Sequence, residues 1–219
     1  MKLSGYLFTL GLLLPAAGVM HGATITFASQ GTPSDPNEWN SLGASITITR
    51  NPAWAPALPG SDWVSYFNTG DPASSLFMSP PNGTVVSFFE LLTLPWEASS
   101  ASITYRADDS AAFYINNVLV RPEAPVAGNT YTRCSDVPVG CTVNTEVTMD
   151  ITPFLSSGAN TLRFDVAQRN GSSFGLNYLG SVAGPGPAIE NPVPEPATFG
   201  LIGMSLLAIG LWRRGPLKG

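Results

Sequence analysis

The chain has 219 residues, a formal net charge of −5 at pH 7, a single histidine and two cysteines. Residues 24–192, which we expect to form the exported body, hold six arginines, no lysine and fourteen acids, a net charge of −8. Such a surface repels nucleic acid and anionic lipid, so no nucleic-acid partner is expected. The histidine, His21, is expected to leave with an N-terminal signal segment, which excludes Ser-His-Asp and Cys-His catalysis in the mature protein.

Residues 1–23 have the features of a secretory signal peptide. Lys2 supplies a positive start, an apolar stretch of signal-peptide length follows, and a proline breaks that stretch before a run of small residues. Cleavage by signal peptidase after Gly18 and cleavage after Ala23 are both compatible with the sequence, and the strand-like pattern that begins at Thr24 favours Ala23. A buried core helix is the alternative for this apolar stretch.

Residues 24–182 are patterned as short β-strands. Apolar and polar residues alternate at period two over stretches separated by turn-forming residues, and no convincing amphipathic helix interrupts them. Asn116 and Asn117 predict a tight hairpin, because asparagine tolerates the positive φ of a primed turn. Many short strands with frequent turns indicate an all-β sandwich. The expected strands are residues 24–28, 44–50, 62–67, 84–92, 101–107, 111–115, 129–133, 142–150, 160–169 and 174–182.

Two segments of this body resemble galactose-binding-like jelly rolls. Residues 101–118 are similar to that family's run of a strand, an Asp-containing turn, a second strand and an Asn turn. Residues 147–162 are similar to its strand, one-turn helix and Gly-Xaa-Asn-Thr-Leu re-entry, in which Asp150 caps a turn started by Pro153. The resemblance implies a jelly-roll, galactose-binding-like β-sandwich over residues 24–182. It implies no particular ligand, because such domains often serve as structural modules.

The two cysteines, Cys134 and Cys141, are seven positions apart. A proline and a glycine between them can turn the chain back on itself, so in an oxidising compartment they are expected to close a small disulfide loop. A metal site at these cysteines is not expected, because two thiols without a nearby histidine supply too few ligands.

Four residues of the body are candidates for ligand contacts. Trp54 and Trp63 flank a Pro-rich loop, where an exposed indole would stack on a sugar face; packing in the core or a loop is the favoured alternative. Asp108 and Asp109 lie in a predicted turn and can contribute to a structural calcium site, although solvated, turn-forming aspartates are the favoured interpretation. No catalytic residue is assigned, because a sequence does not reveal the separation of acids that glycoside hydrolysis needs.

A Gly- and Pro-rich linker is predicted at residues 183–192, before a short motif at residues 193–196. The prolines of this motif, Pro194 and Pro196, fix φ and hold their neighbours in extended conformations, so the motif cannot join a helix. Glu195 is thereby presented as the only charge just outside the apolar run that follows. A protease can read such a signal; a Pro-rich spacer before an ordinary anchor is the alternative.

Residues 197–212 form an uncharged run of sixteen residues, about 24 Å long as a helix, which we predict to be a transmembrane helix. The basic tail at residues 213–219 begins with Arg213 and Arg214, which act as a membrane stop. Under the positive-inside rule these arginines stay cytoplasmic, which places the body on the far side of the membrane. The chain is therefore expected to pass through an inner-membrane intermediate.

The signal peptide, motif, apolar helix and basic tail together resemble the PEP-CTERM proteins of Gram-negative bacteria. In that family the motif, here Pro194, Glu195 and Pro196, is the recognition site of an exosortase. This membrane cysteine transpeptidase removes the helix and passes the protein to the cell surface or extracellular matrix. The resemblance covers residues 193–219 and implies nothing about the body. The sequence leaves open whether the helix is removed or retained.

These expectations describe an exported, exosortase-processed protein of the cell surface or extracellular matrix. Its β-sandwich is expected to be structural or adhesive rather than enzymatic, and extracellular polysaccharide is the partner that a glycan-binding role would have. A secreted carbohydrate-active enzyme is the alternative. The missing histidine and the lack of a recognisable nucleophile motif favour the non-enzymatic role. Apart from the calcium considered above, no cofactor is expected.

Overall fold

The computed structural model describes residues 22–123, 127–132 and 134–186, which belong to one compact unit. Several sequence predictions lie outside these residues: the signal segment with the cleavage site after Gly18, the end of the linker, and the sorting residues Pro194, Glu195, Pro196, Arg213 and Arg214. Within the described ranges, no helix has the length and apolarity needed to cross a bilayer.

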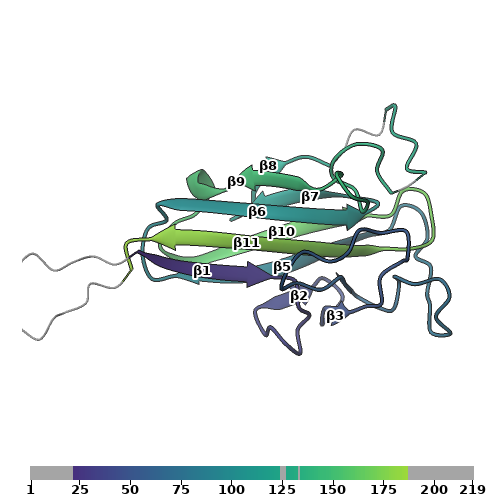
Figure 1. The fold of residues 1–219 in the computed structure, drawn as a ribbon, viewed down its shortest axis with the longest axis horizontal. Helices are drawn as coiled ribbons and strands as arrows, with labels where there is room; N and C mark the ends of the chain where they lie inside the picture. The colour runs from purple at the N-terminus through teal and green to yellow at the C-terminus, as the bar shows by residue number, and fades with distance from the viewer. Residues whose placement is uncertain (1–21, 124–126, 133, 187–219) are drawn as a thin grey trace, which may run out of the picture. The chain divides into compact units, whose positions relative to one another are not determined.

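The described residues form two antiparallel sheets, which confirms the all-β sandwich. The six-stranded sheet has the order β3-β4-β11-β6-β9, with β1 also paired to β11, and the five-stranded sheet has the order β2-β5-β10-β7-β8. Figure 1 shows the long strands β1, β11 and β6 side by side, with the other sheet layered against them. The first sheet comprises β1 (Ala23–Ala28), β3 (Ile46–Thr47), β4 (Val64–Ser65), β6 (Ser100–Asp108), β9 (Val147–Asp150) and β11 (Gly175–Gly184). The second comprises β2 (Glu38–Asn40), β5 (Val85–Leu94), β7 (Ser110–Ile115), β8 (Val118–Arg121) and β10 (Gly158–Ala167).

The core lies between the sheets, where alternate residues of the long strands point inward. Leu162, Phe164 and Val166 of β10 are fully buried, as their period-two spacing predicts. Phe164 stacks between Phe113 of β7 and Tyr178 of β11, with ring centroids 4.7 and 5.0 Å apart. Such aromatic pairs contribute about 0.5 to 1.5 kcal/mol beyond their buried area. Because Tyr178 belongs to the opposite sheet, this stack ties the two layers together.

Two local predictions are confirmed. Asn116 and Asn117 have positive φ values of 51° and 65° and connect β7 to β8 as a tight hairpin. The one-turn helix expected after β9 is present as the 3₁₀ turn η1 (Thr152–Phe154), and Asp150 Oδ1 accepts the Thr152 N–H at 2.9 Å. Both features depend on side chains within a few positions of the turn, which is why the sequence reveals them.

The strand predicted at residues 129–133 is wrong over its described part, which is an irregular loop containing one isolated bridge. Tyr131 has a positive φ of 53°, and Asn129 Oδ1 accepts the N–H groups of Tyr131 and Asp136 at 3.1 and 3.0 Å. These local side-chain bonds replace a strand ladder. The strand predicted at 142–150 pairs only over β9, its last four residues.

Other strand boundaries differ because pairing partners, rather than alternation, end a strand. The predicted strands at 44–50 and 62–67 are paired only over β3 and β4, two residues each. β2 was not predicted, since three residues carry no period-two signal. β11 ends two residues beyond the predicted domain boundary, at Gly184, which pairs with Ala23 of β1.

Candidate functional site

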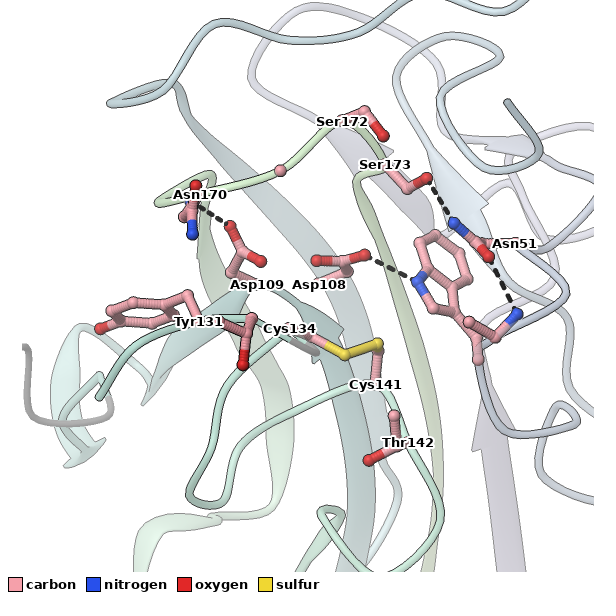
Figure 2. Close-up of a pocket in the computed structure, with 14 residues that line it drawn as sticks. Asn51, Asp108, Asp109, Tyr131, Cys134, Cys141, Thr142, Asn170, Ser172 and Ser173 are labelled. Carbon is pink, nitrogen blue, oxygen red and sulfur yellow. Dashed lines mark hydrogen bonds between the residues drawn. A yellow bond between two sulfur atoms is a disulfide. The ribbon is translucent and has the colours of Figure 1, made fainter. Parts of the chain in front are cut away.

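A pocket of about 430 Å³ lies where β6 ends and β7 begins. Its lining residues come from four parts of the chain: Asn51, Ala53 and Trp54; Asp108 and Asp109; Tyr131, Thr132, Cys134, Cys141 and Thr142; and residues 170–173. Figure 2 shows Asp108 and Asp109 between the disulfide and the 170–173 loop. The pocket therefore gathers residues that are far apart in the sequence around two consecutive carboxylates.

Asp108 is the more deeply constrained of the two acids. It is 6% exposed, and the Trp54 indole Nε1 donates to its Oδ2 at 2.7 Å. Burial raises the pKa of Asp108 well above its ordinary value, and the hydrogen bond and charge of Asp109 raise that pKa further. The bond from Trp54 acts in the opposite direction. Asp108 is thus an acid that holds its proton more strongly than a solvated aspartate does.

Asp109 is 1% exposed and organises the loop after β10. Its Oδ2 accepts the backbone N–H groups of Arg169 and Asn170 at 2.7 and 2.8 Å. The bonds to Asp108 and Asp109 described here all end on the Oδ2 atoms of the two carboxyl groups. The interpretation of these residues as solvated turn aspartates is wrong, because loops from four parts of the chain cover them.

Trp54 and Trp63 pack against each other, with ring centroids 4.4 Å apart. They are 4% and 2% exposed, so neither indole offers an open face on the surface. Trp63 Nε1 donates to the carbonyl of Ala55 at 3.1 Å and does not line the pocket. Of the two tryptophans, only Trp54 lines the pocket, and its contact with a ligand stays a prediction.

The Cys134–Cys141 disulfide is present, as predicted, and forms one wall of the pocket. Ligand atoms of Asp108 and both cysteines lie within 4.8 Å of one another, which makes them the one such trio among the described residues. Bridged sulfurs are not thiolates, so this trio is not a metal centre while the disulfide is closed.

A salt bridge between Arg169 and Glu123 supports the loop that carries Asn170. Burial alone would raise the pKa of Glu123, but the hydrogen bonds from Arg169 and Ser110 outweigh it, and the pKa lies below its ordinary value. On the opposite side, Asn51 Nδ2 donates to Ser173 Oγ at 2.8 Å. These bonds hold two walls of the pocket in place.

Sequence reasoning missed several pocket residues. The run Asn170, Gly171, Ser172 and Ser173 is a turn-forming cluster, so its position in a loop was visible in the sequence. Its packing against Asp109 was not, because the two segments are sixty positions apart.

Residues 192–214 match the PEP-CTERM protein-sorting motif. The chain therefore carries an exosortase-targeted sorting signal and is an exported protein that is processed at the membrane. The match contains the tripeptide, apolar run and arginines from which the sequence predicted this signal. No curated protein matches the chain.

Several solved structures are similar to the body. A family 35 carbohydrate binding module from Clostridium thermocellum shares 16% identity over 73% of this chain and 97% of its own, with a TM-score of 0.38. Streptomyces avermitilis alpha-L-rhamnosidase complexed with L-rhamnose shares 21% identity over 63% of this chain and 12% of its own, with a TM-score of 0.43. Exo-beta-1,3-galactanase from Phanerochaete chrysosporium shares 15% identity over 77% of this chain and 29% of its own, with a TM-score of 0.35. All three TM-scores are below 0.5, so the functional argument rests on this chain's own residues.

Proposed function

We propose that the processed protein is a structural or adhesive component of the cell surface or extracellular matrix of a Gram-negative bacterium, and that it binds a neutral glycan in the Asp108–Asp109 pocket. The observation that carries the proposal is the meeting of two buried carboxylates with amide and hydroxyl side chains in one open pocket. The sorting signal supports the location, because an exported protein meets extracellular polysaccharide.

The pocket has the chemistry that sugar hydroxyls need. Carboxylate oxygens accept hydrogen bonds from hydroxyls, while Asn51, Asn170 and Ser173 add amide and hydroxyl groups to the lining. Its volume of about 430 Å³ falls in the range of small-ligand sites.

Electrostatics decides between classes of glycan. Among the described residues that line the pocket, none is basic and two are acidic. An anionic sugar such as a uronate would bring its charge next to these carboxylates without a compensating cation from these residues, which is unfavourable in a partly desolvated site. A neutral glycan has no such penalty.

The carboxylate pair also fits part of a calcium site. Calcium takes six to eight oxygen ligands, of which Asp108 and Asp109 would supply carboxylate oxygens and water or ligand hydroxyls the remainder. When bound, the ion would supply positive charge that attracts sugar hydroxyl oxygens. The carboxylates would hold it, and the backbone bonds to Asp109 would keep that side chain in place.

The catalytic alternative has one observation in its favour, the raised pKa of Asp108, which suits a general acid. The geometry argues against it. Glycoside hydrolases hold their two carboxyl groups about 5 to 9.5 Å apart, whereas Asp108 and Asp109 are consecutive residues, and Asp109 lies close enough to raise the pKa of Asp108 directly. We therefore favour binding over hydrolysis.

Glycan-array binding of the purified protein, with calcium and with EDTA, tests the proposal. Binding to neutral glycans should weaken at least tenfold in Asp108→Asn and Asp109→Asn, which keep the size and the acceptor oxygen of the native side chains. Asp71→Asn is the matched control, because Asp71 accepts an N–H in an exposed turn and does not line the pocket. Equal binding by all variants would refute the site, and hydrolysis of chromogenic glycosides that Asp108→Asn abolishes would favour the enzyme.

A further inference from the structure

The loop after β10 contains one of the two Asn-Gly pairs of the chain, Asn170–Gly171, and the other pair is Asn82–Gly83. An asparagine followed by glycine can lose its side-chain amide, because glycine has no side chain that shields its backbone nitrogen. That nitrogen attacks the side-chain carbonyl carbon of the asparagine before it. Whether a given pair reacts therefore depends on whether the glycine N–H is free and the backbone can turn.

The Asn170–Gly171 pair has an accessible glycine nitrogen. Both residues are exposed in the loop that lines the pocket (Figure 2). None of the hydrogen bonds among the described residues includes the Gly171 N–H. Gly171 has a φ of 147°, and beyond its chain neighbours a Cβ at this position would meet only Asp109 Oδ1, at 3.9 Å. The space around the attacking nitrogen is therefore open.

The loop is held on both sides of this pair but not between. Asp109 Oδ2 accepts the Asn170 N–H at 2.8 Å, and the Ser173 hydroxyl donates to a backbone carbonyl at 2.8 Å. Among the described residues, the one bond between these two points runs from Asn170 Nδ2 to the carbonyl of Thr130, at 3.3 Å. It holds the nitrogen that would leave, not the carbon that is attacked. The peptide between Asn170 and Gly171 can therefore reorient toward the side chain.

The Asn82–Gly83 pair has the opposite environment. The Gly83 N–H donates to the carbonyl of Gln168 at 2.7 Å, and Gln168 is fully buried. The next residue, Thr84, donates its N–H to the Pro81 carbonyl at 3.1 Å and accepts the Gln168 N–H at 2.8 Å. Attack by the Gly83 nitrogen needs these bonds to open first, which costs free energy. The same dipeptide is thus exposed to reaction at one position and protected at the other.

We propose that Asn170 is a site of spontaneous deamidation, at which an amide of the pocket becomes a carboxylate. The Gly171 nitrogen gives up its proton and bonds to the side-chain carbonyl carbon of Asn170. The bond from that carbon to Nδ2 breaks, and Nδ2 leaves as ammonia with the proton. Solvent water then opens the resulting succinimide ring at either of its carbonyls, which leaves aspartate or isoaspartate at position 170.

The product changes both the charge and the shape of the pocket. It adds a third acid to a lining that has two acids and no base among its described residues. Isoaspartate also lengthens the backbone directly after the N–H that binds Asp109. The charge of the pocket would therefore change as the protein ages, and faster at alkaline pH, because the attacking nitrogen must lose its proton.

Peptide mapping by mass spectrometry of the full-length protein in detergent, incubated at pH 8.5, tests the proposal. Asn170 should convert roughly tenfold faster than Asn82 in the folded protein, because the bonds around Gly83 must open first. In guanidinium chloride the two rates should converge, since unfolding removes both environments. Asn170→Gln should abolish the product at position 170, because the longer side chain would have to close a larger ring, and should leave the conversion of Asn82 unchanged.

Equal rates at the two sites in the folded protein, or a faster rate at Asn82, overturn the proposal. A rate at Asn170 that rises more than about tenfold on unfolding also overturns it, because the fold would then protect this residue. The comparison of the two wild-type sites needs no variant, so it holds even if Asn170→Gln does not fold. The peptide map detects the modified side chain itself, and its result does not depend on whether the pocket binds a glycan.

Discussion

Replacing Trp54 with phenylalanine removes the N–H that donates to Asp108 Oδ2 at 2.7 Å but keeps an aromatic ring in the site. A hydrogen bond to a charged group contributes about 1.5 to 3 kcal/mol, and one between neutral groups about 0.5 to 1.5 kcal/mol. Trp63→Phe is the matched control: Trp63 is equally buried, but its indole donates to the neutral carbonyl of Ala55. The Trp54 variant should therefore lose about 1 to 2 kcal/mol more free energy of unfolding than the control.

The difference in lost free energy of unfolding between Trp54→Phe and Trp63→Phe should depend on pH. Burial, followed by the effect of Asp109, raises the pKa of Asp108 above its unfolded value, so wild-type stability falls as pH rises through the folded pKa. The Trp54 bond favours the ionised carboxylate, and its removal raises that pKa further. The additional free energy of unfolding that Trp54→Phe loses relative to the control should accordingly be small at acidic pH and reach its largest value at alkaline pH.

Chemical denaturation followed by circular dichroism at pH 4, 7 and 9 measures both variants on one scale. The control should show a loss that varies little with pH, because neither Trp63 nor its acceptor titrates. Equal losses in the two variants at every pH, or a larger excess at pH 4 than at pH 9, would contradict the assignment of Trp54 as the donor that stabilises ionised Asp108.

Three further predictions follow from other contacts. Replacing Cys134 and Cys141 with alanine should lower the free energy of unfolding by about 2 to 3 kcal/mol and weaken glycan binding, since the disulfide forms a pocket wall; unaltered binding on the array argues against that wall. Gly180→Ala should cost about 1 to 3 kcal/mol, because the added Cβ would overlap the Phe27 ring, and Phe27→Leu in the same protein should restore part of the loss in a thermal melt. Glu195→Ala should leave an unprocessed, membrane-held precursor on gel fractionation; normal processing would show that the exosortase does not read this charge.

Features that depend on neighbouring residues were visible in the sequence. The alternation of Leu162, Phe164 and Val166 predicts an inward-facing strand, and the structure buries all three. The Asn116–Asn117 hairpin follows from backbone preferences of two adjacent residues. The sorting motif is likewise contiguous, so its residues could be identified without a fold.

Features that depend on residues far apart in the chain could not be predicted from the sequence. Asp108 is a buried acid rather than a solvated turn residue because Trp54, fifty-four positions earlier, covers and binds it. The segment 129–133 has strand-like composition, yet the Asn129 side chain bonds to the local backbone and prevents pairing.

The opposition of Glu38 and Glu90 depends on the register of β2 against β5, and a three-residue strand carries no periodic signal for that register. Period and turn chemistry are local properties, so the sequence alone determined the all-β class, the hairpin and the sorting signal. Burial and pKa are set by which side chains meet across the sandwich, so only the tertiary structure decided where the pocket lies and which acids are held away from water.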